Sequence, residues 1–478
     1  MKTKGSFTDK LFTGLAIAGL MFSSIVFTAC EDDNDNNDDP EPDPIEETSE
    51  FKFISAYVEG DNGSLPEDYE EQLEEHFNNN NNIVDSTGLV SLDFSDILNT
   101  IIPASGEAGD GEPLSGDDFI EEVSYQGAFE PGGSNWASWT LTYDLEDYQN
   151  GSYTYQSNDT VTVSGKITSD ETWEKSTLYK LEGFVFVTEG ATLTIEAGTM
   201  IQGLPGQGEN ASALIISRDG KIMAEGTPEM PIVFTGDDDT YTGDSYSKTV
   251  SGLWGGLIVL GEATNNNPND NYRIEGIPDS EDYPGTYGGD NPNHNSGVLE
   301  YISIRHGGTN IGQGNEINGL TLGSVGTGTT INNIEVIANV DDGVEWFGGT
   351  ANTKHLLVSY CGDDSFDYDE GFTGKGQFWA TIQADGTGDR LGEHDSGGDG
   401  EGEEPRSRPQ IYNATYVGHG GKLITLRDDA GAVYANSIFY NTNNGIEIEY
   451  REDLHNSWNQ FEEGNIIIKN NIFKDIAK

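Results

Sequence analysis

A repeat of about 22 residues runs through the second half of the chain and limits the folds open to it. The segment "INNIEVI" begins at Ile331 and "TKHLLVS" begins 22 residues later at Thr353. "IYNATYV" at Ile411 and "VYANSIF" at Val433 keep the same interval, and "IIKNNIF" follows at Ile467. The longer gaps equal one repeat plus insertions of 36 and 12 residues. Short strands at a fixed interval predict an all-β fold, a right-handed parallel β-helix with coils of about 22 residues.

The repeat also predicts which side chains point into the solenoid. The second strand of each coil aligns as "DDGVEWF" (341–347), "DDSFDYD" (363–369), "GKLITLR" (421–427) and "NNGIEIE" (443–449). Side chains alternate between the two faces of a strand, so each aligned position has one orientation. The predicted inward positions are Val344, Phe366, Ile424 and Ile446, and Trp346, Tyr368, Leu426 and Ile448. The predicted outward positions are Glu345, Asp367, Thr425 and Glu447, and Phe347, Asp369, Arg427 and Glu449.

Acidic residues occupy the turn before this strand in two successive coils. Asp341 is expected to stack on Asp363, and Asp342 on Asp364, at the roughly 4.8 Å spacing of adjacent strands. Two carboxylates that close repel by about 1 kcal/mol in water and by more where solvent is reduced. A cation, a proton or a nearby Arg or Lys must offset that repulsion.

Three interpretations of these acids stay open. One is a solvated polar turn, in which Asp side chains cap the strand corner. A second is a Ca²⁺ site, because clustered carboxylate oxygens suit that ion. The ligands would then be Asp341, Asp342, Asp363, Asp364 and Glu345. The third is acid–base catalysis on a uronate-rich glycan. Its catalytic residues would be Asp363, Asp364, Asp367 and Asp369, with Lys375, Arg390 or Arg427 as the charge stabiliser.

The 36-residue insertion between the second and third repeat segments contains "ADGTGDRLGEHDSGGDGEGEEPRSRP". It is expected to overhang the acidic face as a surface loop, with His394 within it. Isolated histidines near turns are more often structural than metal ligands, and no HxH or HxxxH spacing occurs.

The N-terminus predicts export and a lipid anchor. Lys2, Lys4 and Lys10 precede an apolar run from Leu11 to Phe27, which is typical of a signal peptide. "FTAC" resembles a bacterial lipobox and makes Cys30 the expected lipidation site. The acid-rich stretch after it cannot bury apolar surface and is expected to be a disordered tether.

The expected domain organisation follows from these features. Residues 1–29 are the signal peptide, 30–50 the lipidated cysteine and tether, 51–118 a small N-terminal region with a linker, and 119–478 the β-helix. Helices are expected at 65–77 and within "LVSLDFSDILNTII". The sequence ends within a strand pattern, "IIIKNNIFKDIAK", so we expect a short last coil or cap.

Composition removes one class of partner. The formal net charge is −61, from 84 acidic and 23 basic residues, and it would repel a nucleic-acid backbone. Cys361 is the second of two cysteines, so acylation of Cys30 would leave no disulfide. Cys361 follows "HLLVSY" and is expected to be a buried thiol at a strand end.

Several longer passages carry a family resemblance. "EGFVFVTEGATLTIEAGTMIQG" (182–203), "GLWGGLIVLGEA", "DDGVEWFGGTANTKHLLV" and "DDSFDYDEGFTGKGQFW" resemble the pectin-lyase-fold β-helix lipoproteins and secreted proteins of Bacteroidetes-type bacteria. The similarity covers roughly residues 155–440. It implies a right-handed β-helix, export and a cell-surface location, and it implies no established activity or catalytic residue set.

Two functions from different classes remain open at this point. The first is an outer-membrane, cell-surface lipoprotein that binds glycan, Ca²⁺ or an outer-membrane partner such as a TonB-dependent receptor. The second is a polysaccharide lyase or glycoside hydrolase that acts on uronate-rich glycans with the same face. Contact with the membrane would be through the lipid anchor only.

Overall fold

The chain divides into two compact units, residues 1–38 and 39–478. The structure, a computed structural model, describes residues 53–59, 64–84, 117–130, 135–143, 154–267, 272–278, 280, 282–312, 315–397, 402–451 and 455–476, all in the second unit. The expected signal peptide, Cys30, the tether and the second N-terminal helix lie outside the described residues. Of the helices that the structure describes, none has the length and apolar character to cross a membrane.

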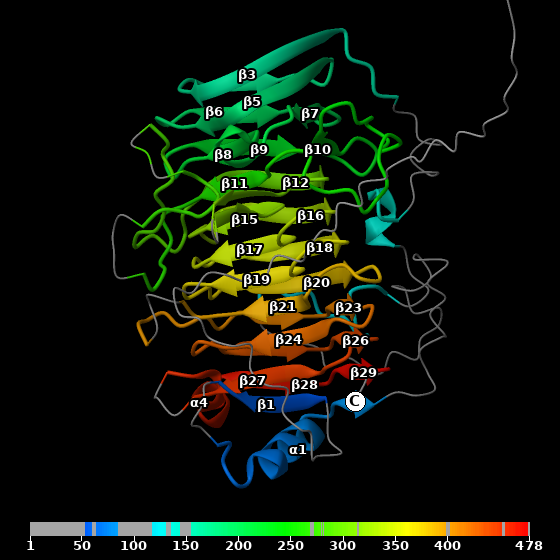
Figure 1. The fold of residues 1–478 in the computed structure, drawn as a ribbon, viewed down its shortest axis with the longest axis vertical. Helices are drawn as coiled ribbons and strands as arrows, with labels where there is room; N and C mark the ends of the chain where they lie inside the picture. Colours follow the sequence, from blue (N-terminus) through cyan, green and yellow to red (C-terminus); the bar gives the residue numbers. More distant parts are fainter. Residues whose placement is uncertain are drawn as a thin grey trace, which may run out of the picture. The chain divides into compact units, whose positions relative to one another are not determined.

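Parallel strands wind through three stacks, and neighbouring coils pair strand on strand (Figure 1). This arrangement confirms the predicted right-handed parallel β-helix. Stack 1 consists of the ends of β3 (Asp159–Ile167) and β5 (Thr177–Val187), then β8 (Ala213–Ile216), β11 (Leu257–Leu260), β15 (Leu320–Gly323), β17 (Val344–Phe347), β19 (Phe366–Asp369), β21 (Arg390–His394), β24 (Lys422–Leu426), β27 (Ile446–Tyr450) and β1 (Ile54–Val58).

Stacks 2 and 3 share several long strands that bend between them. Stack 2 consists of β4 (Glu171–Trp173), β6 (Thr192–Ile195), β9 (Lys221–Glu225), the first halves of β12 (Gly297–Arg305), β16 (Thr330–Ile337), β18 (Thr353–Ser359) and β20 (Lys375–Ile382), then β22 (Gln410–Tyr412), β25 (Ala432–Ala435) and β28 (Ile466–Lys469). Stack 3 consists of the starts of β3 and β5, β7 (Met200–Gly203), β10 (Ile232–Gly236), the second halves of the shared strands, β23 (Thr415–Val417), β26 (Ile438–Tyr440), β29 (Ile472–Lys474) and β2 (Ile83–Val84).

The bend between stacks 2 and 3 is a single residue in the left-handed conformation. In four coils Asn333, Asn413, Asn436 and Asn470 occupy it with φ of 53–55°, and in three others Tyr301, His355 and Phe378 do so. Asn tolerates this conformation better than most residues because its side chain hydrogen-bonds locally. The Asn470 amide also donates to Asn436 Oδ1 on the next coil, so the bends stack in register.

The inward columns predicted from the repeat are confirmed. Val344 lies beside Phe366, and Trp346 lies beside Tyr368, on neighbouring coils. All four side chains are fully buried. Trp346 also stacks on Trp379 of β20 with ring centroids 4.8 Å apart. Cys361 is a buried free thiol, as expected for a cysteine at a strand end.

The predicted helix near the N-terminus exists, and it caps the far end of the solenoid. Helix α1 (Tyr69–Asn79) lies between β1 and β2, and β1 pairs with β27 while β2 pairs with β29 (Figure 1). Phe77 of α1 contacts Phe53 and Phe473, with ring centroids 5.4 and 5.5 Å away. Residues 53–59 and 64–84 therefore close the end of the solenoid where a short coil or cap was expected.

Residues 117–130 and 135–143, the covering segment, lie on the outside of stacks 2 and 3. The 3-10 helix η1 (Trp136–Trp139) and its neighbours pack on apolar outward residues of stack 3. Buried Glu335 of β16 accepts hydrogen bonds from the amides of Leu141 (3.0 Å) and Thr142 (2.7 Å). This covering segment lies on stacks 2 and 3, and the acidic outer face belongs to stack 1.

The insertion expected to be a surface loop is largely an additional coil, so that prediction was wrong. β20 continues stacks 2 and 3 after β18, and β21 lies between β19 and β24 in stack 1. Asp367 therefore lies beside Glu345 and Glu393, and it is not adjacent to Thr425. The remaining described elements are η2 (Gly208–Asn210), the β13 (Thr309–Gly312)–β14 (Asn315–Ile317) hairpin and α4 (Ser457–Glu462).

Candidate functional site

The outer face of stack 1 changes from apolar to acidic along the solenoid. One outward column contains, coil by coil, Phe186, Ile215, Ile258, Thr321, Glu345, Asp367, Glu393, Thr425, Glu447 and Ser55. Its apolar members pack against Ile274, Tyr287 and Ile317 from the loop after β11 and the β13–β14 hairpin. The column is therefore covered over the early coils and becomes polar where β17 begins.

Three carboxyl groups meet at the start of the acidic part. Asp342, Glu345 and Asp367 each place an oxygen within 4.8 Å of the others. Asp342 and Glu345 are buried and Asp367 is half-buried. Burial raises the pKa of all three well above the usual range, and repulsion from neighbouring carboxylates raises it further. We call these residues the inner triad.

The next two coils balance their acids with arginine. Arg390 Nη1 lies 2.9 Å from Glu393 Oε1, and Arg427 Nη1 lies 3.3 Å from the same oxygen. Burial would raise the pKa of Glu393, but Arg427 and Arg390 outweigh it and the pKa is lowered. Arg427 Nε also lies 2.8 Å from Asp395 Oδ1. Burial still raises the pKa of Asp395 to about 7, because this ion pair offsets the desolvation only in part.

The second outward column differs from the sequence prediction. It reads Phe347, Asp369, Asp395, Arg427, Glu449 and Tyr57, since β21 inserts Asp395 between Asp369 and Arg427. Burial raises the pKa of Asp369 well above its ordinary value, and the carboxylate of Asp395 adds to the effect. Arg427 is thus a partner of Asp395 and Glu393 and does not contact Asp369.

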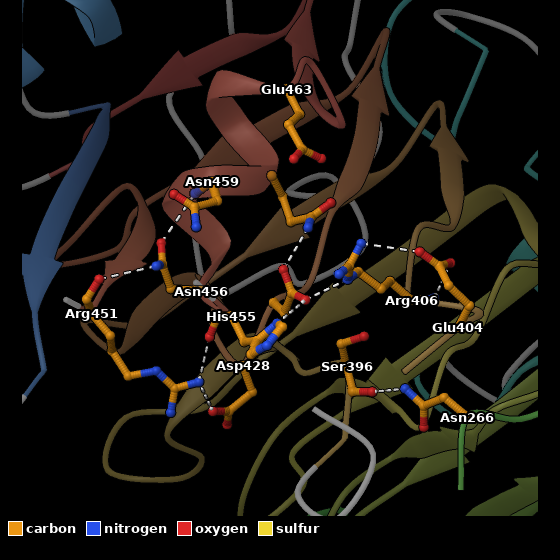
Figure 2. Close-up of polar contacts among 12 residues, drawn as sticks. Asn266, Ser396, Glu404, Arg406, Asp428, Arg451, His455, Asn456, Asn459 and Glu463 are labelled. Atoms are coloured by element: carbon orange, nitrogen blue, oxygen red, sulfur yellow. Dashed lines mark hydrogen bonds and ion pairs between the residues drawn. The ribbon is translucent and has the colours of Figure 1, made fainter. Parts of the chain in front are cut away.

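The loops at the capped end of the face are tied together by ion pairs, as Figure 2 shows. Arg406 binds Glu404 (3.0 Å) and Asp429, while Arg451 binds Asp428 at 2.9 Å and donates to the carbonyl of His455 (Figure 2). These ion pairs tie Arg406 and Arg451 to Asp429 and Asp428, which follow β24.

The acidic turns predicted to stack do so. Asp342 Oδ1 accepts a hydrogen bond from the amide of Asp364, 2.8 Å away, and Asp341, Asp342 and Asp363 bring oxygens within 4.8 Å of one another. A further group joins Asp363 and Asp364 to Asp389. Asp364 has a cationic neighbour, Arg390 Nη1, at 3.6 Å. Burial is nevertheless the largest influence on Asp364 and raises its pKa.

Two residues weighed from the sequence lie away from this face. Lys375 begins β20 in stack 2 and forms an ion pair with Asp117, so it cannot stabilise charge near Asp364. The His394 side chain points from β21 into the core of the solenoid. Its ring stacks on that of Tyr368 with centroids 4.0 Å apart, and its Nε2 lies 2.6 Å from the Tyr434 hydroxyl. Burial lowers the pKa of His394 to about 3, so the ring is neutral.

Sequence reasoning missed Glu393, Asp395 and Asn318. The signal for the first two was present, because "DRLGEHD" (389–395) repeats the acids at the first, fifth and seventh positions of "DDSFDYD". It was hidden by Gly392, which replaces the bulky inward residue of other coils. An added Cβ there would lie 2.7 Å from His394 Cε1, so the ring requires glycine. Asn318 follows the β13–β14 hairpin and contacts Glu345, and no sequence pattern around Asn318 indicates this contact.

Comparison with known proteins places this geometry in a family. The model of the pectate-lyase-like β-helix domain matches residues 165–478, about two thirds of the chain. No curated protein and no solved structure shows a significant match. The matched region contains every coil from the end of β3 onward and the whole acidic face. The chain therefore belongs to the pectate-lyase-like β-helix family.

Proposed function

We propose that this is an exported, lipid-anchored protein of the outer membrane that binds glycan at the cell surface through the outer face of stack 1. The export signal and Cys30 support the location, since an N-terminal lipid would leave a β-helix free in solution near the membrane. An outer-membrane receptor remains the proposed protein partner.

The observation that carries the glycan proposal is the polar ladder Glu345, Asp367, Glu393 and Thr425 on successive coils. Each rung offers hydrogen-bond acceptors about 4.8 Å from the next. A polyhydroxylated chain laid along the solenoid axis would donate a hydroxyl to Asp367, which is half-buried, while Glu345, Glu393 and Thr425 on the neighbouring coils are buried. Carboxylate acceptors make charge-assisted hydrogen bonds, which are stronger than neutral ones.

The test is a glycan array followed by titration calorimetry on residues 39–478, the unit that contains every described element. Glu393→Gln should weaken binding of any glycan found by roughly 10- to 150-fold, since one hydrogen bond to a charged group contributes on the order of 1.5–3 kcal/mol. Thr425→Ala should weaken it by roughly 2- to 10-fold, since a neutral hydrogen bond contributes about 0.5–1.5 kcal/mol. The matched control is Glu74→Gln on the exposed face of α1. Equal affinity for all variants would place the ligand elsewhere.

One observation favours hydrolysis as a second candidate function. On adjacent coils the pKa of Asp367 is raised and that of Glu393 is lowered, which is how a general acid and an ionised partner are separated in glycosidases. Elimination is less well supported, because Arg390 and Arg427 are both ion-paired and neither is available as a base.

Hydrolysis is tested by release of reducing ends from a panel of glycans. An enzyme should lose turnover in Asp367→Asn while still binding substrate, and its rate should fall as pH rises through the pKa of the acid. If no glycan in the panel is cleaved by the unmodified protein, the binding function alone stands.

A further inference from the structure

Among the described residues, the first coil of the solenoid ends in a sheet edge with no further strand beside it. β3 pairs only with β5 and β4 only with β6, whereas α1, β1 and β2 close the opposite end (Figure 1). About half of the backbone N–H and C=O groups along such an edge have no partner in the sheet. β3 has nine residues, which is longer than the usual strand of about five or six.

The first part of β3 lacks the usual protections of an edge strand. Natural edges are shielded by Pro, by Lys or by bulges that bend the strand away from a neighbour. Residues 159–163, "DTVTV", contain neither Pro nor Lys. The register shift of β3 comes after them, between Val163 and Gly165. Thr and Val alternate after Asp159, and both residue types favour pairing with another strand.

The large apolar side chains that are exposed in the described part of the chain lie on the two terminal strands of stack 3. Val161 of β3 is 39% exposed, and Ile83 and Val84 of β2 are 42% and 52% exposed. The core beneath β3 is closed, because Trp173 is buried and stacks on Tyr179 with ring centroids 4.7 Å apart. The open feature at this end is therefore the edge of the strand.

The two sides of the first coil carry charges of opposite sign. The end of β3 continues into stack 1 and contains Lys166, which is exposed and forms no ion pair within the described residues. β4 lies in stack 2 and begins at exposed Glu171, directly after exposed Asp170. The three stacks form the three sides of each coil, so a two-fold axis perpendicular to stack 3 exchanges the stack 1 side with the stack 2 side.

We propose that the free edge of β3 pairs with the β3 edge of a second copy of this chain, antiparallel and about that two-fold axis. The backbone groups of the two edges then bond to each other, and Val161 of each copy is covered. Lys166 of each copy faces Glu171 of the other, so the charges favour this arrangement. The pairing uses the same edge on both copies, so the assembly stops at two. It depends on neither glycan binding nor the lipid anchor.

The first test measures the mass of residues 39–478 by analytical ultracentrifugation at physiological salt, which screens the repulsion between two acidic proteins. We expect twice the monomer mass at high concentration and dissociation on dilution. Val161→Lys places a charge on each edge and should give a monomer with an unchanged melting temperature. Val84→Lys on β2 is the matched control and should still dimerise.

Three results of this first test would overturn the proposal. One is a monomer at every concentration. The others are an assembly that grows beyond two copies and an association that Val84→Lys abolishes, because β3 would then pair with β2 of the next copy and form an open chain.

The second test changes the two charges and leaves the paired strand intact. Lys166→Glu and Glu171→Lys should each weaken dimerisation by about tenfold or more, because each places two like-charged pairs across the interface. An equimolar mixture of the two variants should recover the dimer, since every pair then joins an acidic and a basic side chain. Lys221→Glu, an exposed change on β9, is the matched control and should leave the dimer intact. Two weakened variants without recovery in the mixture would show that the proposed arrangement is wrong.

Discussion

Replacement of Phe77 by alanine is expected to release the N-terminal cap from the end of the solenoid. Phe77 is buried between Phe53 and Phe473, and Leu73 lies buried one turn earlier on α1. A buried Phe→Ala change costs about 3–5 kcal/mol, from lost transfer energy and the cavity left behind. The cap is small, so this loss is a large part of its docking energy.

The consequence is local opening and not global unfolding. A loss of about 3 kcal/mol raises the open population of the cap roughly 150-fold, while coils distant from β27 keep their contacts. Hydrogen exchange reports this directly. The amide of Ile446 donates to the carbonyl of Phe53 (3.0 Å), and the amide of Glu59 donates to the carbonyl of Tyr450 (3.1 Å). Both amides should therefore exchange roughly 150-fold faster.

Glu74→Ala, an exposed change on the same helix, is the control and should alter exchange at these amides by less than threefold. The reasoning is refuted if Phe77→Ala leaves the Ile446 and Glu59 amides as protected as before. It is also refuted if amides of β8 and β11 lose protection to the same extent, because the cap would then not be a separate cooperative unit.

Three further predictions concern buried ionisable groups. Stability should fall as pH rises above the ordinary carboxyl range, because burial raises the pKa of Asp342, Glu345 and Asp367 and their extra protons favour the folded state only at lower pH. Urea titrations that show a flat profile, or the same slope in Asp367→Asn, would contradict this. His394 has the opposite effect: its pKa of about 3 means that up to about 5 kcal/mol of stability is lost as pH falls from 6.5 to 3, and His394→Gln should remove that loss in acid denaturation. Finally, Glu335→Ala should leave the amides of Leu141 and Thr142 without their acceptor and destabilise the covering segment by about 2–4 kcal/mol, visible as faster exchange at those two amides while Ile446 is unchanged.

The inner and outer columns could be predicted from the sequence because strand periodicity leaves few alternatives. A one-residue slip would have buried Glu345 and Asp367 in the core and exposed Trp346 and Tyr368. Burying these carboxylates and exposing these aromatic rings would cost a large amount of free energy. The repeat therefore predicts both the coil to which each residue belongs and whether its side chain points inward or outward. The stacking of Asp342 against the next turn followed from the same register.

The partners of the acids could not be predicted, since they depend on the additional coil. Gly392 and His394 replace the usual inward pair of bulky apolar residues, so β21 does not match the pattern of its neighbours. β21 can be recognised as a strand of stack 1 only once His394 is known to stack on Tyr368, which is a contact between two coils. A sequence alignment that omits β21 places Arg427 next to Asp369, whereas in the structure Arg427 binds Asp395 and Glu393.

The solenoid and a negative outer face could be predicted from the sequence, because each depends on local periodicity or composition. The contacts between coils show which acids meet without a counter-charge, and that residues 53–59 and 64–84 close the end formed by β27 and β29. The physical reason is the separation in sequence between the residues that interact. Periodicity acts between residues a few positions apart, whereas Asn318 on Glu345 and β1 on β27 are contacts that exist only after the coils are stacked.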